Sequence, residues 1–305
     1  MSMEPAVSAY IQIKADIERA LSLGRPVVAL ESTVITHGLP FPDNLTLAED
    51  MEREVRQQGA VPATIAVLEG LIQIGLSPVQ LERLATGQNL HKISTRDFAR
   101  VIARRESGGT TVAGTLVAAH AAGIKVFATG GIGGVHRRSA WDISTDLLQL
   151  AHTPLIVVCA GAKAVLDLPA TLEYLETHAV RVLGYQTDTF PAFYSSSSKL
   201  PVEVRVDSPG EVALQASIHW ELGLKSAILV AVPPPEDVAL PEEQVLGAIE
   251  QALGEVQEKG LRGQSVTPFL LKRVSELTHG ASLKANLGLL KNNAKVAAQI
   301  ALQIR

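Results

Sequence analysis

The amino-acid sequence predicts a three-layer α/β/α domain built on a mainly parallel, mixed central sheet. Short runs rich in Val, Ile, Leu and Ala alternate along the chain with longer segments of helical character. Most of these runs are continuously apolar, which is typical of parallel strands buried on both faces. The 305 residues and an apolar share of 47% suffice for one large core, and we expect a single domain over residues 1–305.

The expected strands are these short apolar runs. Because only 4% of the residues are aromatic, aliphatic side chains must fill the core between the sheet and the helices. In chain order the expected strands are 26–30, 63–68, 125–129, 154–160, 181–185 and 227–232.

Helical segments fill the intervals between the strands, and two of them have recognisable end signals. Asp43 is placed to cap the segment 44–58, because aspartate is a favoured N-cap residue. Gly123 is placed to end the segment 111–122, because glycine readily adopts the left-handed conformation beyond a helix end. The prolines at 233–235 indicate a turn but no domain boundary. The other expected helices are 142–150, 169–177, 211–222, 241–259 and 283–304.

The composition excludes several classes of protein. The net charge is -4 and no basic run is longer than Arg137-Arg138, so nothing indicates a nucleic-acid-binding surface. No stretch of about 18 apolar residues occurs, so we expect no membrane span. The single cysteine, Cys159, cannot form an intramolecular disulfide, and the first residues lack the pattern of a secretion signal. The cytoplasm is therefore the expected compartment.

Functional residues are expected in the loops that follow strands, because ligands of open α/β sheets bind beyond the carboxyl ends of the strands. Glu31 comes directly after the run 26–30, within the segment ALESTVITHGLPFPDN. Partial burial raises the pKa of such a carboxyl and suits it to general acid catalysis; a salt-bridged or capping glutamate is the structural alternative. His37 in the same segment could be catalytic, although a lone histidine is more often a hydrogen-bonding structural residue.

Two glycine-containing segments offer places for an anionic ligand. In the segment 108–114, GGTTVAG, glycines and threonines open a helix whose N–H groups bind anions, or the segment is a plain N-cap. In the segment 127–147, four glycines follow a strand, but His136 occupies the last glycine position of GxGxxG. A dinucleotide-binding loop is therefore excluded, while the glycines still allow the backbone to approach a ligand closely.

The second of these segments also contains oxygen ligands for a metal. Asp142 and Asp146 are four residues apart on an expected helix, hence on one face, and one of them could hold a hard divalent ion. Helix-start acids favoured by the macrodipole are the alternative. His136, Arg137 and Ser144 add cationic groups and a hydroxyl. No histidines are paired at the spacing of a zinc site, so zinc is not expected.

Lys163 follows a wholly apolar strand by a few residues and lies among small residues. Burial lowers the pKa of a lysine and gives the free amine that attacks a carbonyl carbon. A surface lysine is the alternative, which the lack of polar neighbours from 155 to 166 weakens. Near the C-terminus, Asn286 and the polar residues 291–293 interrupt an apolar helix, and they either line a site or form its solvated face.

Long ungapped motifs make the chain similar to a known family. LESTVITHGLPFPDN, GGTTVAGT, GGIGGVHR and VVCAGAK resemble the pseudouridine-5'-phosphate glycosidases, the indigoidine synthase A-like proteins, and the similarity extends over residues 27–298. The resemblance implies an α/β/α homotrimer that uses a divalent metal, usually manganese (Mn²⁺). It also implies reversible cleavage of the C–C glycosidic bond of pseudouridine 5'-phosphate, which gives uracil and ribose 5-phosphate.

The resemblance further implies roles for single residues. Lys163 is the implied Schiff-base nucleophile, Glu31 the proton donor and Asp142 the metal ligand. The segment 138–141 fills a shorter path than is usual in the family, which bears on the metal and phosphate contacts of this loop. The implied substrate contacts are Lys92, Val112, Ser144, Thr145, Asp146 and Asn286.

An amine nucleophile suits this bond because the leaving carbon, C5 of uracil, has no lone pair to protonate, unlike the oxygen that ordinary glycosidases protonate. We expect Lys163 to add at C1′ of the ring-opened ribose. Protonation of C5 then breaks the C–C bond and leaves an iminium on Lys163, which water hydrolyses to release ribose 5-phosphate, while Glu31 moves protons. Two alternatives stay open. One is a class I aldolase-like lyase on another phosphosugar, which accepts no uracil. The other is a non-catalytic phosphosugar-binding or assembly protein.

Overall fold

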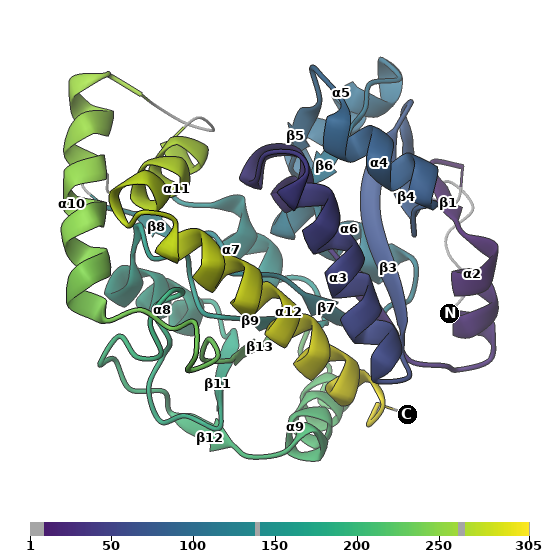
Figure 1. Cartoon of the computed structure of the whole chain (residues 1–305). Helices are drawn as coiled ribbons and strands as arrows, with labels where there is room; N and C mark the ends of the chain where they lie inside the picture. Colours follow the sequence, from purple (N-terminus) through teal and green to yellow (C-terminus); the bar gives the residue numbers. More distant parts are fainter. Residues whose placement is uncertain (1–8, 138–140, 262–265, 305) are drawn as a thin grey trace.

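The structure, a computed structural model, describes residues 9–137, 141–261 and 266–304 of the chain. Within them, eleven strands form a central sheet with helices on both faces, so the expected three-layer fold is confirmed (Figure 1). The eleven strands are β1 (Ile11–Ile13), β2 (Val27–Leu30), β3 (Val61–Leu68), β4 (Leu71–Ile74), β5 (His91–Ile93), β6 (Gly108–Thr110), β7 (Val126–Ala128), β9 (Ile156–Cys159), β11 (Arg181–Tyr185), β12 (Val204–Val206) and β13 (Ile228–Ala231). Two further strands, β8 (Val135–His136) and β10 (Leu166–Asp167), pair antiparallel in a separate small sheet.

The helices alternate with these strands along the chain. They comprise α-helices, a short π-helical turn η1 and a 3₁₀ turn η2. The α-helices α8 and α9 begin at an Asp or Ser N-cap followed by proline in the first turn, which is a favoured helix start. The bounds are α2 (Ala15–Ser22), η1 (Val34–Gly38), α3 (Asp43–Gln57), α4 (Pro78–Thr86), η2 (Thr95–Asp97), α5 (Phe98–Ala103), α6 (Val112–Ala121), α7 (Thr145–Leu150), α8 (Leu168–Thr177), α9 (Pro209–Glu221), α10 (Glu242–Glu258), α11 (Val266–Leu277) and α12 (Ala281–Ala301).

The strand order of the large sheet is β1-β4-β3-β2-β7-β9-β13-β11-β12, with β6 beside β3 and β5 beside β6. All neighbours from β3 through β2 to β12 are parallel, whereas β4 and β6 run antiparallel to β3. The sheet is therefore mixed. The chain leaves β2 toward β3 on one side and later adds β7 on the other side. Such a switch of direction is where open parallel sheets bind their ligands.

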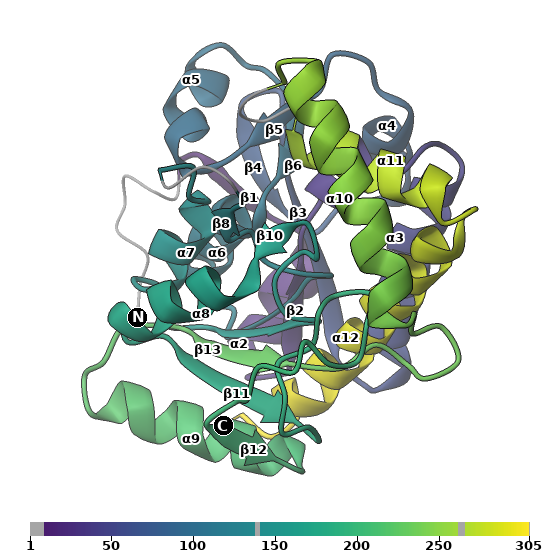
Figure 2. The same ribbon diagram turned by 90° about the vertical axis from the view of Figure 1, so that its left-hand side faces the viewer.

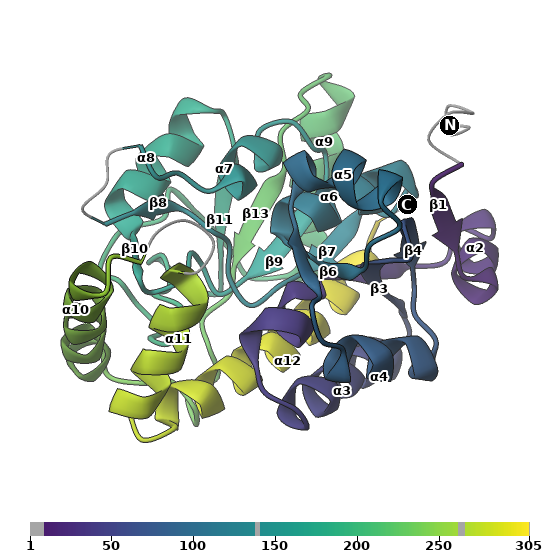
Figure 3. The same ribbon diagram turned by 90° about the horizontal axis from the view of Figure 1, so that it is seen from above.

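The two outer layers are built from different parts of the chain. On one face, α12 contacts α3 and the strands β2, β7 and β9. On the opposite face, α6 contacts β2, β3 and α7 (Figure 3). At one end of the molecule α10 packs on α11 (Figure 2). Among the helices of the described residues, none combines the length and the apolar character of a bilayer span.

The six predicted strands are all present, but the sheet also contains strands that the hydrophobic pattern did not reveal. The clearest is β4, which forms a hairpin with β3. Its turn consists of Glu69 and Gly70, at φ 52° and 79°, and two successive positive φ values give the tight turn that suits the twist of a hairpin. The segment Gly108–Thr110, predicted to open a helix, is instead the strand β6, and α6 begins after it.

Two predicted helix starts are wrong. Asp43 is the first residue of α3 and not its cap: Pro42 takes the cap position and no side chain caps the helix. The helix predicted over 142–150 begins only at Thr145, because the Ser144 side chain accepts from the N–H of Asp146 and caps α7 there. The preceding residues pair with the strand β8, through His136 N–H donating to the carbonyl of Asp142 at 2.9 Å. Gly123, at φ 80°, lies just beyond α6 as predicted.

Candidate active site

Three adjacent parallel strands, β2, β7 and β9, end at one polar centre. Leu30 pairs with Ala128, so the next residues along each strand, Glu31 and Thr129, are neighbours. Lys163 lies on the loop four residues after β9. The loops after β7 and β9 are joined because the N–H of Lys163 donates to the carbonyl of Ile132 at 3.0 Å. The register of the sheet therefore brings together side chains that lie far apart in the sequence.

Glu31 is a buried acid, with 7% of the residue exposed. The Thr129 hydroxyl donates a hydrogen bond to its Oε1. Burial raises the pKa of Glu31 above its ordinary value, against the opposing effects of Lys163, the Thr129 hydrogen bond and Lys92. A carboxyl with a raised pKa keeps its proton nearer to neutral pH, and this is what a general acid needs.

Lys163 is half-buried and faces the same centre. Its loop turns sharply at Gly161, at φ 84°, where a Cβ would lie 2.4 Å from the carbonyl oxygen of Pro191. Only glycine fits such a place, so the turn that carries Lys163 is fixed by packing. Within residues 9–137, 141–261 and 266–304 we find no ion pair or hydrogen bond of its ammonium group. The side chain is thus available to a ligand.

Lys92 reaches the centre from β5, a strand of three residues that pairs with β6. Burial lowers the pKa of Lys92, and the positive charge of Lys163 lowers it further, while Asp146 and Glu31 act in the opposite direction. Two lysines and one acid therefore face each other in a partly desolvated space. Desolvated ionisable groups that act on each other in this way are typical of catalytic sites.

A cavity with two lobes opens at this centre. Glu31, Thr33, Lys92 and Lys163 line both lobes. The first lobe, of about 220 Å³, is polar, and the second has mostly apolar walls. The other residues of the polar lobe are Ser94, Arg96, Thr111, Val112, Gly133, His136, Asp142, Ile143, Ser144, Thr145, Asp146 and Leu166. Those of the apolar lobe are Val34, His37, Gly38, Gly130, Gly131, Phe193, Pro268, Leu271, Asn286 and Leu290.

All residues to which the resemblance gives a role line this cavity. Arg137 does not, because its guanidinium donates to the carbonyl of Leu166 and to Glu250. The predicted substrate contacts other than Asn286 surround the polar lobe, and Asn286 projects from α12 into the apolar lobe. These positions are compatible with the predicted roles, which stay predictions.

The two aspartates predicted to share a helix face have different environments. Asp146 is buried, and its two carboxylate oxygens accept from the N–H groups of Ala113 and Gly133, each at 2.9 Å. It therefore links the start of α6 to the glycine loop. Asp142 precedes the helix, and its side chain is 45% exposed, with Oδ2 4.0 Å from Nδ1 of His136. The predicted common face is wrong, because the helix begins after Asp142.

The donor set suits a metal that keeps much of its water. The described residues contain no group of three or more His, Cys, Asp or Glu side chains placed to hold an ion. Asp142 is an accessible carboxylate on the wall of the polar lobe. Magnesium-like ions are often bound by one or two carboxylates together with water and substrate phosphate. The residues present therefore fit an ion shared with the substrate and not a closed cage.

The glycine loop packs closely against the rest of the protein. Gly130, Gly131 and Gly133 also line the cavity, and the predicted close approach of their backbone to a ligand stays a prediction. A Cβ added at Gly130, Gly131, Gly133 or Gly134 would lie 3.1 Å or less from a side chain of the protein itself. The glycines thus allow the loop to pack against neighbouring elements. The side chains that occupy these places are Leu290, Phe193, Ser144 and Thr171.

Sequence reasoning missed several residues of the site. The sequence marks Thr129 only as the end of a strand, although its position beside Glu31 follows from the pairing of the two strands. Phe193, at φ 63°, and Arg96 line the two lobes without any motif that marks them. Asn293, one of the polar residues of the C-terminal helix, is fully buried and donates to the Thr129 carbonyl at 2.8 Å.

The fold and the site define an α/β/α enzyme, with a desolvated acid and two lysines at the switch point of a parallel sheet. Residues 16–303 match the family described as indigoidine synthase A like protein. The chain belongs to this family.

Named relatives and solved structures agree with this membership. The chain is 51% identical to the pseudouridine-5'-phosphate glycosidase of Caldanaerobacter subterraneus subsp. tengcongensis, covering 97% of each chain. It is 50% identical to that of Escherichia coli K12, covering 95% of this chain and 94% of the relative. The crystal structure of the prealnumycin C-glycosynthase AlnA in complex with ribulose 5-phosphate superposes with a TM-score of 0.89, at 40% identity over 96% of both chains. An indigoidine synthase A-like protein from Thermotoga maritima gives 0.88, at 34% identity over 96% of this chain and 95% of that one.

Proposed function

We propose that the protein reversibly cleaves the C–C glycosidic bond of pseudouridine 5'-phosphate to uracil and ribose 5-phosphate through a Schiff base on Lys163. The observation that carries the proposal is the meeting of Glu31 and Lys163 at the junction of a polar and an apolar lobe. Relatives at about half identity over nearly the whole chain have the same named activity. A structural neighbour binds a pentose phosphate.

The chemistry of the walls assigns the phosphosugar to the polar lobe, of about 220 Å³, and the base to the smaller apolar lobe, of about 50 Å³. The apolar lobe offers the ring of Phe193 to a flat base and the amide of Asn286 to its polar edge. The polar lobe offers two cationic side chains, Lys92 and Arg96, to a phosphate. Lys92 is half-buried, and among the described residues Arg96 makes no ion pair, so its charge is available to a ligand. The scissile bond would then lie beside Glu31 and Lys163, which line both lobes.

The reaction begins with opening of the ribose ring. Glu31 gives a proton to the ring oxygen O4′ as the O4′–C1′ bond breaks and the uracil ring supplies electrons to C1′. The amine of Lys163 then adds to C1′ and forms a C–N bond, which restores the uracil ring. A positioned acid of this kind contributes about 10²–10⁴-fold to the rate.

The C–C bond breaks in the next step. The ammonium that Lys163 forms on addition returns a proton to the Glu31 carboxylate, which frees the lone pair of the Lys163 nitrogen. Glu31 then protonates uracil C5, the C1′–C5 electron pair goes to the uracil ring, and the Lys163 lone pair forms a C1′=N⁺ iminium. Uracil leaves. Water adds to C1′, and loss of the amine gives ribose 5-phosphate and free Lys163. The phosphate holds the opened sugar in place throughout, so remote binding supports the chemistry at C1′.

We also propose that Asp142 binds Mn²⁺, with water and the substrate as further ligands. When bound, the ion would supply positive charge near the phosphosugar. The support is the accessible carboxylate on the polar lobe and the resemblance to a metal-using family. We further propose that the protein is a homotrimer and that it acts in the cytoplasm. A mass in solution three times that of the chain would support the trimer.

The activity is tested by incubating the protein with pseudouridine 5'-phosphate and Mn²⁺ and measuring uracil. Borohydride in the presence of ribose 5-phosphate should reduce the imine and leave a stable mass increment on the peptide that contains Lys163. Uracil release with a label on another residue would reject Lys163. A label on Lys163 without uracil release would favour a lyase acting on another phosphosugar.

A further inference from the structure

The helix α12 holds the loop after β7 through one buried amide. Asn293 is fully buried, and its Nδ2 donates to the carbonyl of Thr129 at 2.8 Å and to that of Gly130 at 3.4 Å. The N–H of Thr129 is held separately, by the carbonyl of Val158 at 3.0 Å. The backbone of Thr129 is therefore fixed from both sides, once by the sheet and once by α12.

The contact requires α12 to approach the loop after β7 closely. A Cβ on Gly130 would lie 3.1 Å from Leu290 of α12, so a glycine here lets the helix come near enough for Asn293 to reach the carbonyls. The two accepting carbonyls also fix the orientation of the amide, because the reverse orientation would place an oxygen against them. Asn293 is thus a specific donor to the Thr129 turn.

The amide is not accounted for by packing alone. Among the described residues, its Oδ1 has no hydrogen-bond partner although it is buried. A buried polar atom without a partner lowers stability, and an apolar side chain of similar size would avoid this. Polar groups that break the local rule for a core tend to serve a functional site.

The contact leads directly to the acid. Thr129 is fully buried and donates its hydroxyl to Oε1 of Glu31, which leaves Oε2 as the oxygen that can carry the proton. The other charged groups that act on Glu31 are Lys163 on the loop after β9, Lys92 on β5 and Asp146 on α7. A shift of Thr129 would change both the position of the proton and the balance of these charges.

We propose that Asn293 is a positioning residue that fixes the Thr129 hydroxyl against Glu31. Asn293 acts through the backbone of Thr129 and touches no reacting atom. Its importance for the reaction rests on the proposed function, while its effect on Glu31 does not.

The test is the titration of Glu31 in the full-length protein, followed by infrared difference spectroscopy of its carboxyl band against the Glu31→Gln variant of the same background. Thr129→Val keeps the side-chain shape and removes the donor, so the midpoint should rise by about one pH unit. Asn293→Leu should also raise the midpoint of Glu31. In a protein that already has Thr129→Val, Asn293→Leu should change the midpoint almost no further. Thr129→Ser, which keeps a hydroxyl, should restore most of the wild-type midpoint.

The matched control is Asn292→Leu, the same change one residue earlier on the same helix, which should leave the midpoint unchanged. A wild-type midpoint in folded Asn293→Leu would overturn the proposal, as would shifts that simply add in the double variant. If Asn293→Leu does not fold, Asn293→Ala takes its place with the same expectations.

The rate of uracil release provides a second readout. Asn293→Leu should lower kcat about tenfold and change KM less than twofold, because an acid that is out of place affects the reaction and not the binding. A wild-type protein that releases no uracil would refute the proposed function, and the titration would still decide the role of Asn293.

Discussion

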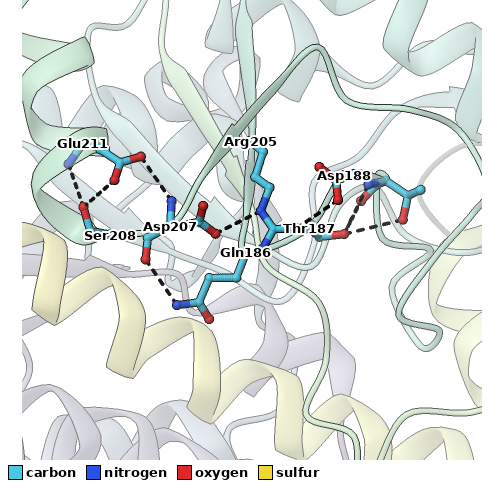
Figure 4. A network of polar contacts seen from close by, with 8 residues as sticks. Gln186, Thr187, Asp188, Arg205, Asp207, Ser208 and Glu211 are labelled. Carbon is cyan, nitrogen blue, oxygen red and sulfur yellow. Dashed lines mark hydrogen bonds and ion pairs between the residues drawn. The ribbon is translucent and has the colours of Figure 1, made fainter.

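Two clusters of polar residues lie at carboxyl ends of parallel strands in the same sheet, and they differ in their access to water. The site cluster consists of Glu31, Lys92, Thr129 and Lys163. The outer cluster lies where β11 and β12 end (Figure 4) and consists of Gln186, Thr187, Asp188, Arg205, Asp207, Ser208 and Glu211.

In the outer cluster the charged groups are ion-paired or hydrogen-bonded within the cluster itself. Arg205 donates to Asp188 and to Asp207, each at 2.9 Å. Glu211 closes the start of α9: it accepts from the hydroxyl of Ser208 at 2.9 Å and from the N–H of Asp207 at 3.2 Å. Arg205 is also 43% exposed at its side chain. Water screens these charges, so the pairs hold a loop and add little else.

In the site cluster the charges are withdrawn from water and do not all pair. Burial is the largest influence on both Glu31 and Lys92, and it opposes the charged form of each. The comparison shows that a position at the end of a strand does not define a site. What distinguishes the active centre is desolvation of groups that remain available to a ligand.

The largest effect should follow loss of the amine. Lys163→Ala should lower kcat for uracil release by about 10⁴-fold or more, because the proposed nucleophile is lost. Lys163→Arg keeps the charge and should be equally inactive. Exposed Lys125 is the control, since Lys125→Ala should retain wild-type kcat. A steady-state uracil assay decides, and an active Lys163→Arg enzyme would show that only the charge matters.

Loss of the acid should have the next largest effect. Glu31→Gln keeps the shape and removes the proton, so kcat should fall about 10²–10⁴-fold with substrate binding retained. Glu211→Gln makes the same change in the outer cluster and should leave kcat as it is. Rapid-quench measurement of uracil separates the two, and equal rates for both variants would remove the distinction between the clusters.

The metal proposal gives an effect of intermediate size. Asp142→Asn should raise the dissociation constant of Mn²⁺ about tenfold or more, because a charged oxygen ligand is lost. Electron paramagnetic resonance of free Mn²⁺ measures this without turnover. Asp188→Asn in the outer cluster should bind Mn²⁺ as the wild type does, and unchanged binding in Asp142→Asn would place the metal elsewhere.

The buried acid should also make stability depend on pH. The pKa of Glu31 is raised in the folded protein, mainly by burial, so the folded state holds the proton more tightly than the unfolded state. The contribution of Glu31 to the free energy of unfolding is therefore largest below the ordinary pKa of glutamate. It declines as the pH rises through the raised pKa of the folded protein. The loss is about 1.4 kcal/mol for each pH unit that separates the pKa of the folded state from that of the unfolded state. Glu31→Gln should lack this decline and melt at a higher temperature than the wild type at alkaline pH. Parallel melting curves at every pH would contradict it.

The smallest effect is expected in the outer cluster. Arg205→Ala should leave kcat unchanged and lower the melting temperature slightly, and high salt should remove most of that difference because exposed ion pairs are screened. A marked loss of activity would mean that the outer cluster also supports the site.

The sequence alone determined the layers of the fold and two central residues of the site. The continuous apolar runs at β2 and β9 indicate strands buried on both faces, because a strand covered on both sides needs apolar residues at every position. The residues that follow such strands, Glu31 and Lys163, could therefore be located from the sequence. The resemblance supplied the roles of the others.

Only the tertiary structure decided how the remaining residues act. Asp142 proved to lie before its helix, Asp146 to be bound by two backbone N–H groups, and Asn293 to hold the Thr129 turn. These facts depend on which strands are neighbours and on where a distant helix packs. A local pattern reports whether a side chain is buried, but its partner is set by chain topology, and contacts such as that between residues 129 and 293 leave no periodic signal in the sequence.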